Sequence, residues 1–235
     1  MNRTLGRQVI AEATGSALLV AVVVGSGIFA QRLSPGDKGL QLLQNSIATG
    51  AALVALILAF GWVSGAHFNP AVTLAERAFG TITTATAAAY IAAQVVGCCI
   101  GSIIANLMFE LPAVELSTRQ RSSGALWLAE IVATFGLLVV ITGVVRSGRP
   151  SAAPFAVGGY IAAAYWFTSS TSFANPAVTL GRTLTDTFAG IAPASAPAFI
   201  AAQLVGASLA IAFARYVFHE PEGIQLVTAH EEPLP

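Results

Sequence analysis

The sequence Asn69-Pro70-Ala71-Val72-Thr73-Leu74 recurs unchanged as Asn175-Pro176-Ala177-Val178-Thr179-Leu180, and each copy follows a hydrophobic segment. Asn is a favoured N-cap, and Pro suits the first helical position because it has no N–H to lose and its φ is already helical. Each copy therefore predicts a helix start. Gly80 ends the first helix, and Gly181, Asp186 and Gly190 interrupt the second. Helices of about nine residues, rising about 1.5 Å each, cross roughly half of a hydrocarbon core of about 30 Å. The pattern predicts two half-helices.

The composition indicates a protein of the lipid bilayer, because 55% of the 235 residues are hydrophobic and only 9% are charged. A helix of about 17 to 25 apolar residues is long enough to cross a bilayer, with allowance for tilt. The sequence predicts six such helices, at residues 9–29, 42–63, 82–109, 126–145, 155–170 and 193–218. The first is too long for the apolar part of a signal peptide, so we expect it to be retained. Nothing indicates a second, soluble domain.

Six crossings place both termini on the same side of the membrane. Arg3 and Arg7 precede the first span, and Arg146 and Arg149 follow the fourth, without acidic neighbours. The positive-inside rule then predicts a multi-pass protein of the cell (inner) membrane with both termini in the cytoplasm. Residues 1–219 are expected to form one channel domain, and the acidic residues 220–235 a solvated, mobile tail.

Groups suited to enzyme chemistry are few. We find no Ser-His-Asp arrangement, phosphate-binding loop or metal-ligand cluster, because the histidines His67, His219 and His230 are scattered. Cys98 and Cys99 are adjacent in the third span, and we interpret them as packing residues since adjacent cysteines rarely pair with each other. The sequence predicts no enzyme activity, no cofactor, no metal and no nucleic-acid partner.

The two halves of the sequence, at about residues 5–112 and 123–219, are copies of each other. Besides the hexapeptides, the third span contains Tyr-Ile-Ala-Ala-Gln-Val-Val-Gly at residues 90–97, and the sixth contains Phe-Ile-Ala-Ala-Gln-Leu-Val-Gly at residues 199–206. Each half contributes three crossings, so the second enters the membrane from the opposite side, and this inverted repeat predicts a site near the midplane. Small residues are expected to allow close packing between the halves, at Gly97, Gly101, Gly206 and Ala210.

The two half-helices of such a repeat point their N-termini at the midplane from opposite sides. Each N-terminus carries roughly half a positive charge and several unpaired N–H groups. Polar backbone at this depth must line a water-filled cavity or be buried in protein, and a pore meets that requirement. We expect Asn69 and Asn175 to cap the half-helices with their amide oxygens and to offer their NH2 groups to passing solutes. The positive field would repel cations.

Glu12 and Glu130 are the acids within the predicted spans, one in each half. They have two interpretations: a relay for protons or ions, or structural acceptors for backbone N–H groups of the re-entrant loops. Their symmetric placement favours the structural role.

The sequence Ser-Gly-Ala-His-Phe-Asn-Pro-Ala-Val-Thr, at residues 64–73, resembles the first re-entrant loop of the aquaporin family, the major intrinsic proteins, and the resemblance extends over residues 5–219. It implies an all-α membrane protein with six tilted helices and two half-helices, a homotetramer in the lipid bilayer with one pore per subunit, and passive conduction of small neutral solutes. It also implies that Glu12 and Glu130 brace the two loops and that Gln94 and Gln203 are paired helix positions.

Val178 departs from the family pattern, in which an arginine usually follows the second motif and completes a narrow outer filter. Counted with the family's spacing, the filter here is Thr49, Ala163, Ser172 and Val178. Water-selective members carry an aromatic ring and a histidine at the first two positions, so we expect a wide and mildly polar filter. Members with this valine resemble a bacterial branch associated with arsenic resistance. The implied solutes are water, glycerol-like polyols, arsenite, antimonite and methylated arsenicals.

Several alternatives stay open at this point. Arg182, about 6 Å nearer the mouth than Val178, is either a vestibule cation or a surface charge paired with Asp186. His67 is either a pH-sensitive pore-loop group or a hydrogen-bond partner within its loop, and the second is favoured. The function has two alternatives, a strict water channel and a proton-coupled secondary transporter, since inverted repeats with broken helices also build transporters.

Overall fold

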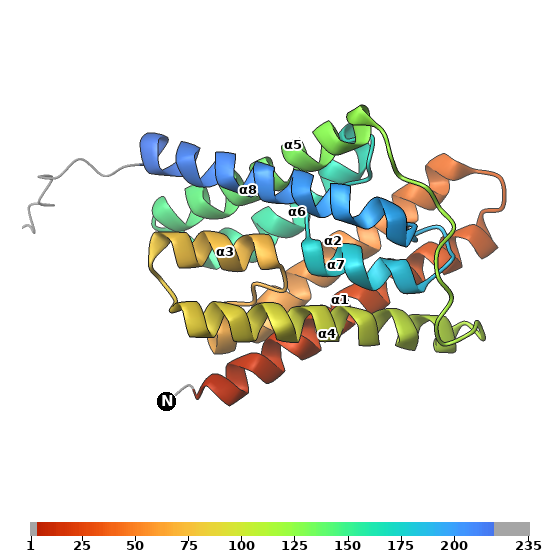
Figure 1. The fold of residues 1–235 in the computed structure, drawn as a ribbon, viewed down its shortest axis with the longest axis horizontal. Coiled ribbons are helices and arrows are strands. Elements are labelled where there is room, and N and C mark those ends of the chain that lie inside the picture. The colour runs from red at the N-terminus through yellow and green to blue at the C-terminus, as the bar shows by residue number, and fades with distance from the viewer. Residues whose placement is uncertain (1–3, 219–235) are drawn as a thin grey trace, which may run out of the picture.

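The computed structural model describes residues 4–218 and shows an all-helical bundle over that part of the chain. Six long helices enclose two short ones, α3 (Pro70–Phe79) and α7 (Pro176–Gly181) (Figure 1). The long helices are α1 (Leu5–Leu33), α2 (Lys38–Ser64), α4 (Thr84–Met108), α5 (Gly124–Arg146), α6 (Ala153–Phe167) and α8 (Ala196–Val217). The predicted all-α fold with six long helices and two half-helices is confirmed, whereas the predicted tail at residues 220–235 lies outside the described residues.

Length and apolar composition suit five of the long helices for crossing a membrane, namely α1, α2, α4, α5 and α8, the last counted with the 3₁₀ turn at Pro193–Ser195. The sixth, α6, has 15 residues and follows a 3₁₀ turn at Pro150–Ala152. Polar caps start several helices: the side chain of Asp37 accepts the N–H of Leu40, and that of Ser123 accepts the N–H of Leu126.

Helix α1 begins and helix α8 ends at the same end of the bundle, the left in Figure 1, which we call the near end. The opposite end, the far end, is crossed by the segment at residues 109–123, which joins α4 to α5. This segment is tied to the loop after α7, because the N–H groups of Glu115 and Ser117 donate to the carbonyls of Leu184 and Thr183, at 3.1 and 3.0 Å. The loops of the far end are therefore held together.

Within each half, the first and last helices pack closely: α1 on α4, and α5 on α8. A Cβ atom at Gly97 or Gly101 would lie 2.2 Å from the carbonyl oxygen of Ala13 or Ala17, and one at Gly206 would lie 2.5 Å from that of Ile131. Glycine is thus required for these backbones to touch. The expectation that these small residues pack between the halves was wrong at these three glycines, since each contact joins two helices of one half.

Candidate functional site: a pore between the two halves

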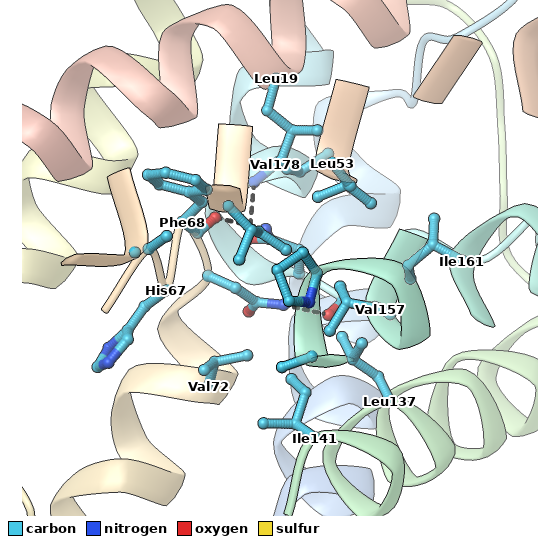
Figure 2. A pocket seen from close by; sticks show the side chains of 18 of the residues that line it. Leu19, Leu53, His67, Phe68, Val72, Leu137, Ile141, Val157, Ile161 and Val178 are labelled. Atoms are coloured by element: carbon cyan, nitrogen blue, oxygen red, sulfur yellow. Dashed lines mark hydrogen bonds between the residues drawn. The ribbon is translucent and has the colours of Figure 1, made fainter. Parts of the chain in front are cut away.

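A cavity of about 520 Å³ lies between the two halves and is lined by residues from both ends of the bundle. Glu76 and Val145 line it towards the near end, and Thr49 and Arg182 line it towards the far end. Because the lining follows the helices along their length, the cavity has the form of a pore. Its middle wall is mainly apolar, formed by Leu19, Leu53, Val72, Leu137, Ile141, Val157 and Ile161 (Figure 2).

The two asparagine caps meet at the middle of this cavity. The side-chain oxygen of Asn69 accepts the N–H of Ala71 at 2.9 Å, and that of Asn175 accepts the N–H of Ala177 at 3.0 Å. Each side-chain NH2 donates across to the other loop: Asn69 to the carbonyl of Ala174 and Asn175 to that of Phe68, both at 2.8 Å. One N–H of each amide is therefore engaged in joining the halves, and only the second remains for solutes, whereas the sequence predicted a free NH2.

The half-helices themselves differ in length. The first, α3, has ten residues and ends at Gly80, whose φ of 83° is in the left-handed region. The second, α7, has six residues and continues as a 3₁₀ turn at Arg182–Leu184. The sequence predicted about nine residues for each half-helix. This prediction is close to the length of α3, and also to the combined length of α7 and its 3₁₀ turn.

Both loops before the half-helices have strained backbones that buried carboxylates hold in place. Phe68 and Ala174 have φ values of 49° and 47°, which non-glycine residues rarely adopt. Glu12 accepts the N–H of Phe68 at 2.7 Å, and Glu130 accepts that of Ala174 at 2.8 Å. Further donors to the two carboxylates are His67 N, Ser64 Oγ and Gln94 Nε2 for Glu12, and Phe173 N and Gln203 Nε2 for Glu130.

This geometry favours the structural interpretation of the two acids. Neither Glu12 nor Glu130 lines the cavity, and both side chains are fully buried. Every carboxylate oxygen accepts at least one hydrogen bond from the residues named above. Gln94 and Gln203 repeat the same pattern in each half, since each also donates to a threonine of the half-helix, Thr73 or Thr179, at 2.9 Å.

His67 lines the cavity and comes two residues before the first asparagine in the sequence. Its Nδ1 lies 3.1 Å from the hydroxyl of Thr73, and its ring packs edge-on against Tyr90 at 5.3 Å. The hydrogen bond within the loop corresponds to the favoured interpretation of this residue.

The predicted filter position on the fifth span needs correction. Ala163 is exposed on the outer face of α6 and does not line the cavity, whereas Ile161 and Tyr165 do. Because successive residues of a helix are rotated by about 100°, the side chain of Ala163 points about 200° away from those of Ile161 and Tyr165, which are two residues before and after it. The hydroxyl of Tyr165 lies 3.1 Å from that of Thr49, so these two residues meet across α2 and α6. Ile161 and Tyr165, which line the cavity, are each two residues from the position that the sequence count gave.

Close approach of the two helices brings this pair together. A Cβ atom at Gly50 would lie 2.9 Å from the carbonyl oxygen of Gly158, and one at Gly158 would lie 2.6 Å from that of Gly50. The two glycines therefore let α2 and α6 touch, one residue from Thr49. Larger side chains at these positions would separate the helices and widen the gap between the hydroxyls.

Ser172 and Val178 line the cavity as the sequence predicted. Val178 is the third residue of α7 and presents its isopropyl group to the cavity (Figure 2). Ser172 has a φ of 48°, and its buried hydroxyl has no hydrogen-bond partner among residues 4–218. It is therefore an unsatisfied polar group in a residue of the cavity wall.

Arg182 lines the cavity although it is only 2% exposed. Its Nε donates to the carbonyl of Ala189, and its Cζ atom lies 3.4 Å from the ring centroid of Phe173. Asp186 points elsewhere and accepts the N–H of Thr118 at 2.9 Å. The alternative of a surface charge paired with Asp186 was therefore wrong.

Sequence reasoning missed Arg121, which comes from the segment covering the far end. Its Cζ atom lies 4.9 Å from the ring centroid of Phe173, and its Nε and Nη1 donate to the carbonyls of Gly190 and Ser170, at 3.0 and 3.3 Å. Burial, and then the neighbouring charge of Arg182, lowers the pKa of Arg121 to about 9, so the group still carries its charge at neutral pH. No periodicity or motif in residues 109–123 indicates that this segment folds back over the cavity.

Known proteins with similar sequences match nearly the whole chain. Residues 2–172 match the family described as Major intrinsic protein. Aquaglyceroporin AqpS of Rhizobium meliloti (strain 1021) is 49% identical over 227 residues, which cover 97% of this chain and 97% of that protein. Aquaporin Z of Bradyrhizobium diazoefficiens is 29% identical over 231 residues, covering 91% of this chain and 94% of its own.

A solved structure has the same fold. The X-ray structure of the aquaglyceroporin from Plasmodium falciparum superposes with a TM-score of 0.74 and 23% sequence identity, covering 92% of this chain and 98% of that chain. At this identity the likeness shows the shared fold and nothing about solutes.

Proposed function

The chain belongs to the major intrinsic protein family, and on this premise we propose that it is a passive channel for water, glycerol-like polyols and neutral arsenic and antimony hydroxides. The members of this family are channels and not enzymes. The observation that carries the proposal is the make-up of the far-end filter, in which Thr49, Tyr165, Ser172 and Val178 line the cavity and no arginine stands at position 178.

Such a filter suits solutes larger than water. Val178 replaces a long charged side chain with a short apolar one, which widens the opening. The hydroxyls of Thr49, Tyr165 and Ser172 then supply hydrogen-bonding groups on the other sides. Glycerol and undissociated arsenite are compact molecules with several hydroxyls, and the mixed wall complements them. The similarity to a protein named aquaglyceroporin supports the same class of solute.

Passive conduction is favoured over coupled transport by the state of the buried acids. Glu12 and Glu130, the acids of the predicted spans, lie behind the wall with their oxygens engaged, so neither is placed beside the solute path to gain and lose protons. Arg182 at the far end supplies a fixed positive charge that repels cations. Together with the half-helix N-termini, it makes the cavity unfavourable for cations along much of its length.

The setting of the channel is also a proposal. We place it in the inner membrane as a homotetramer with both termini in the cytoplasm, supported by Arg146 and Arg149 at the near end and by the family. The near end then faces the cytoplasm and the far end the outside.

Stopped-flow swelling of proteoliposomes tests the function directly. Purified protein is reconstituted and challenged with gradients of water, glycerol and arsenite, with a pH-sensitive dye inside. We expect all three to cross faster than in empty liposomes, with flux linear in solute concentration and no change of internal pH. Fast water with glycerol and arsenite at the empty-liposome rate would support the strict water channel. Saturating flux that depends on a proton gradient would support the transporter.

A further inference from the structure

Two buried guanidinium groups lie close together at the far end of the cavity. Arg121 and Arg182 both pack on the ring of Phe173, with Cζ atoms 4.9 and 3.4 Å from its centroid, so their charges are no farther apart than the sum of these distances. Their Nε atoms donate to the adjacent carbonyls of Gly190 and Ala189. The two side chains belong to distant parts of the sequence, yet one ring and one short turn position both.

Neither arginine has a carboxylate partner among residues 4–218. The hydrogen bonds given above for both groups go to backbone carbonyls, which are neutral. Nearby acids are occupied elsewhere, since Glu130 accepts three N–H groups of its own half and Asp186 accepts donors from Thr118. A buried charge without a counter-charge is unfavourable, and two together more so. Such a pair is the arrangement expected where a negative ligand supplies the missing charge.

Further donors of this region belong to two residues that line the cavity. Arg182 lines it and uses only Nε for its hydrogen bond within the described chain, which leaves both terminal Nη nitrogens available. The buried hydroxyl of Ser172 has no partner among residues 4–218 and lines the same cavity. A planar guanidinium fork with a hydroxyl donor beside it matches a small oxyanion.

Charge around this position adds to the attraction. Arg119, in the same segment, lies over the ring of Phe188 at 5.5 Å and adds a positive charge near Arg121 and Arg182. Arg182 itself follows the C-terminal end of α7, so the attraction comes from the charged side chains and not from the dipole of this helix. Below Arg182, the wall turns apolar at Val178, Leu53 and Ile161, where an anion would lose its water without new partners.

We propose that the far-end mouth is a binding site for small monovalent oxyanions, held by Arg182 with Arg121 and Ser172, and that an anion bound there obstructs the passage of neutral solutes. The inference rests on the proposed channel function for its flux readout. The positive groups retain the anion at the mouth, and the apolar wall beyond it opposes further entry. Neutral solutes must pass the same opening, so occupancy by the anion lowers their flux.

Nitrate is a suitable probe because it is small, planar and charged at all relevant pH values. Swelling in glycerol is measured while sodium nitrate replaces sodium gluconate at constant ionic strength, the bulky gluconate serving as an anion that does not fit. We expect about 100 mM nitrate to reduce glycerol flux at least about twofold, as for a ligand with a dissociation constant in the millimolar range. Arg182→Gln should abolish the reduction, and Arg121→Gln should weaken it.

Two controls separate the site from a general effect of charge or folding. Lys38→Gln removes one positive charge from an exposed position at the start of α2, at the far end, and should retain the full nitrate effect. Arg182→Lys keeps the charge and should retain part of it. Glycerol flux of Arg182→Gln in gluconate shows that this variant is folded and conducting. A nitrate effect of equal size in the parent and in Arg182→Gln, or none in the parent, overturns the proposal.

A second readout distinguishes failure of this inference from failure of the proposed function. Water permeability is measured in the same vesicles, and nitrate should lower it as well because water uses the same opening. If glycerol does not cross the parent at all but nitrate still slows water through Arg182, the glycerol function fails and the anion site stands. If glycerol crosses and nitrate changes neither flux, the anion site fails and the channel function stands.

Discussion

The two re-entrant loops carry the same hexapeptide but have different surroundings. Around Asn69 the half-helix is ten residues long and ends at an exposed glycine near the chain termini. Around Asn175 the α-helical part is six residues long and leads into the buried Arg182, over which the segment at residues 109–123 folds. Symmetry is therefore kept at the midplane, where each half must support the other, and is lost at the far end, where we propose that solutes are selected.

Replacement of the bracing acids probes the symmetric part and should have the largest effect. Glu12→Gln and Glu130→Gln each replace one of the two acceptor oxygens by an NH2, so donors of the strained loop face a donor in place of an acceptor. We expect each to lower the free energy of unfolding by about 3 kcal/mol. The unfolding temperature of the purified protein and the rate of proteoliposome swelling in glycerol should both fall, and to a similar extent in the two variants.

A different outcome would revive the relay interpretation. If either variant melted like the parent and conducted glycerol normally while losing only a proton-coupled component, the acid would be a functional titrating group. Ser208 lies on the exposed face of α8 and does not line the cavity. Ser208→Ala is therefore a control for the purification and reconstitution of a variant, and it should match the parent in both assays.

The far-end filter is the asymmetric part, and Val178→Arg restores the long charged side chain common in the family. We expect glycerol and arsenite flux to fall about tenfold, which corresponds to an added barrier of about 1.4 kcal/mol, while water flux changes little. Val178→Thr is the matched control, because it has nearly the same shape and no charge, and should conduct like the parent. Equal arsenite flux in Val178→Arg and the parent would remove Val178 from the filter.

The cation barrier tests whether the two halves contribute equally to the field at the midplane. Asn69→Asp and Asn175→Asp each place a negative charge beside the half-helix N-termini, so the positive field there weakens. We expect sodium conductance of reconstituted bilayers to rise, by about tenfold in either variant if local cation concentration follows the field. Adding Arg182→Gln to Asn175→Asp should raise it further. Negligible conductance in all three would contradict the electrostatic account of cation exclusion.

The sequence predicted the symmetric features better than the asymmetric ones. Asn-Pro at the start of each half-helix, and one acid per half, follow from local capping rules and from the duplication, so their positions could be counted directly. Arg121 could not be found this way, because its place depends on how a segment without regular secondary structure folds across the far end. The burial of Arg182 depends on the same segment, so the sequence left its role open between two interpretations.

The fifth span shows a further limit of counting. Periodicity indicates which face of a helix points inward only when that face differs in polarity from the opposite face. Helix α6 is apolar on every side. Nothing in residues 153–167 therefore distinguishes the face with Ile161 from the face with Ala163. The close contact of Gly50 with Gly158, which sets that face, joins positions more than a hundred residues apart and is visible only in the folded chain.

Two substitutions on α6 separate these faces and should have the smallest effects. Tyr165→Phe removes a hydroxyl from the filter but keeps the ring, so we expect glycerol flux to change about two- to threefold, the effect of one modest hydrogen bond. Ala163→Leu enlarges a side chain on the exposed face and should leave swelling in water and glycerol as in the parent. If Ala163→Leu slowed glycerol while sparing water, and Tyr165→Phe changed nothing, the filter would lie on the face that family spacing first indicated. The contact between Thr49 and Tyr165 would then be a packing contact between α2 and α6 without a part in selection.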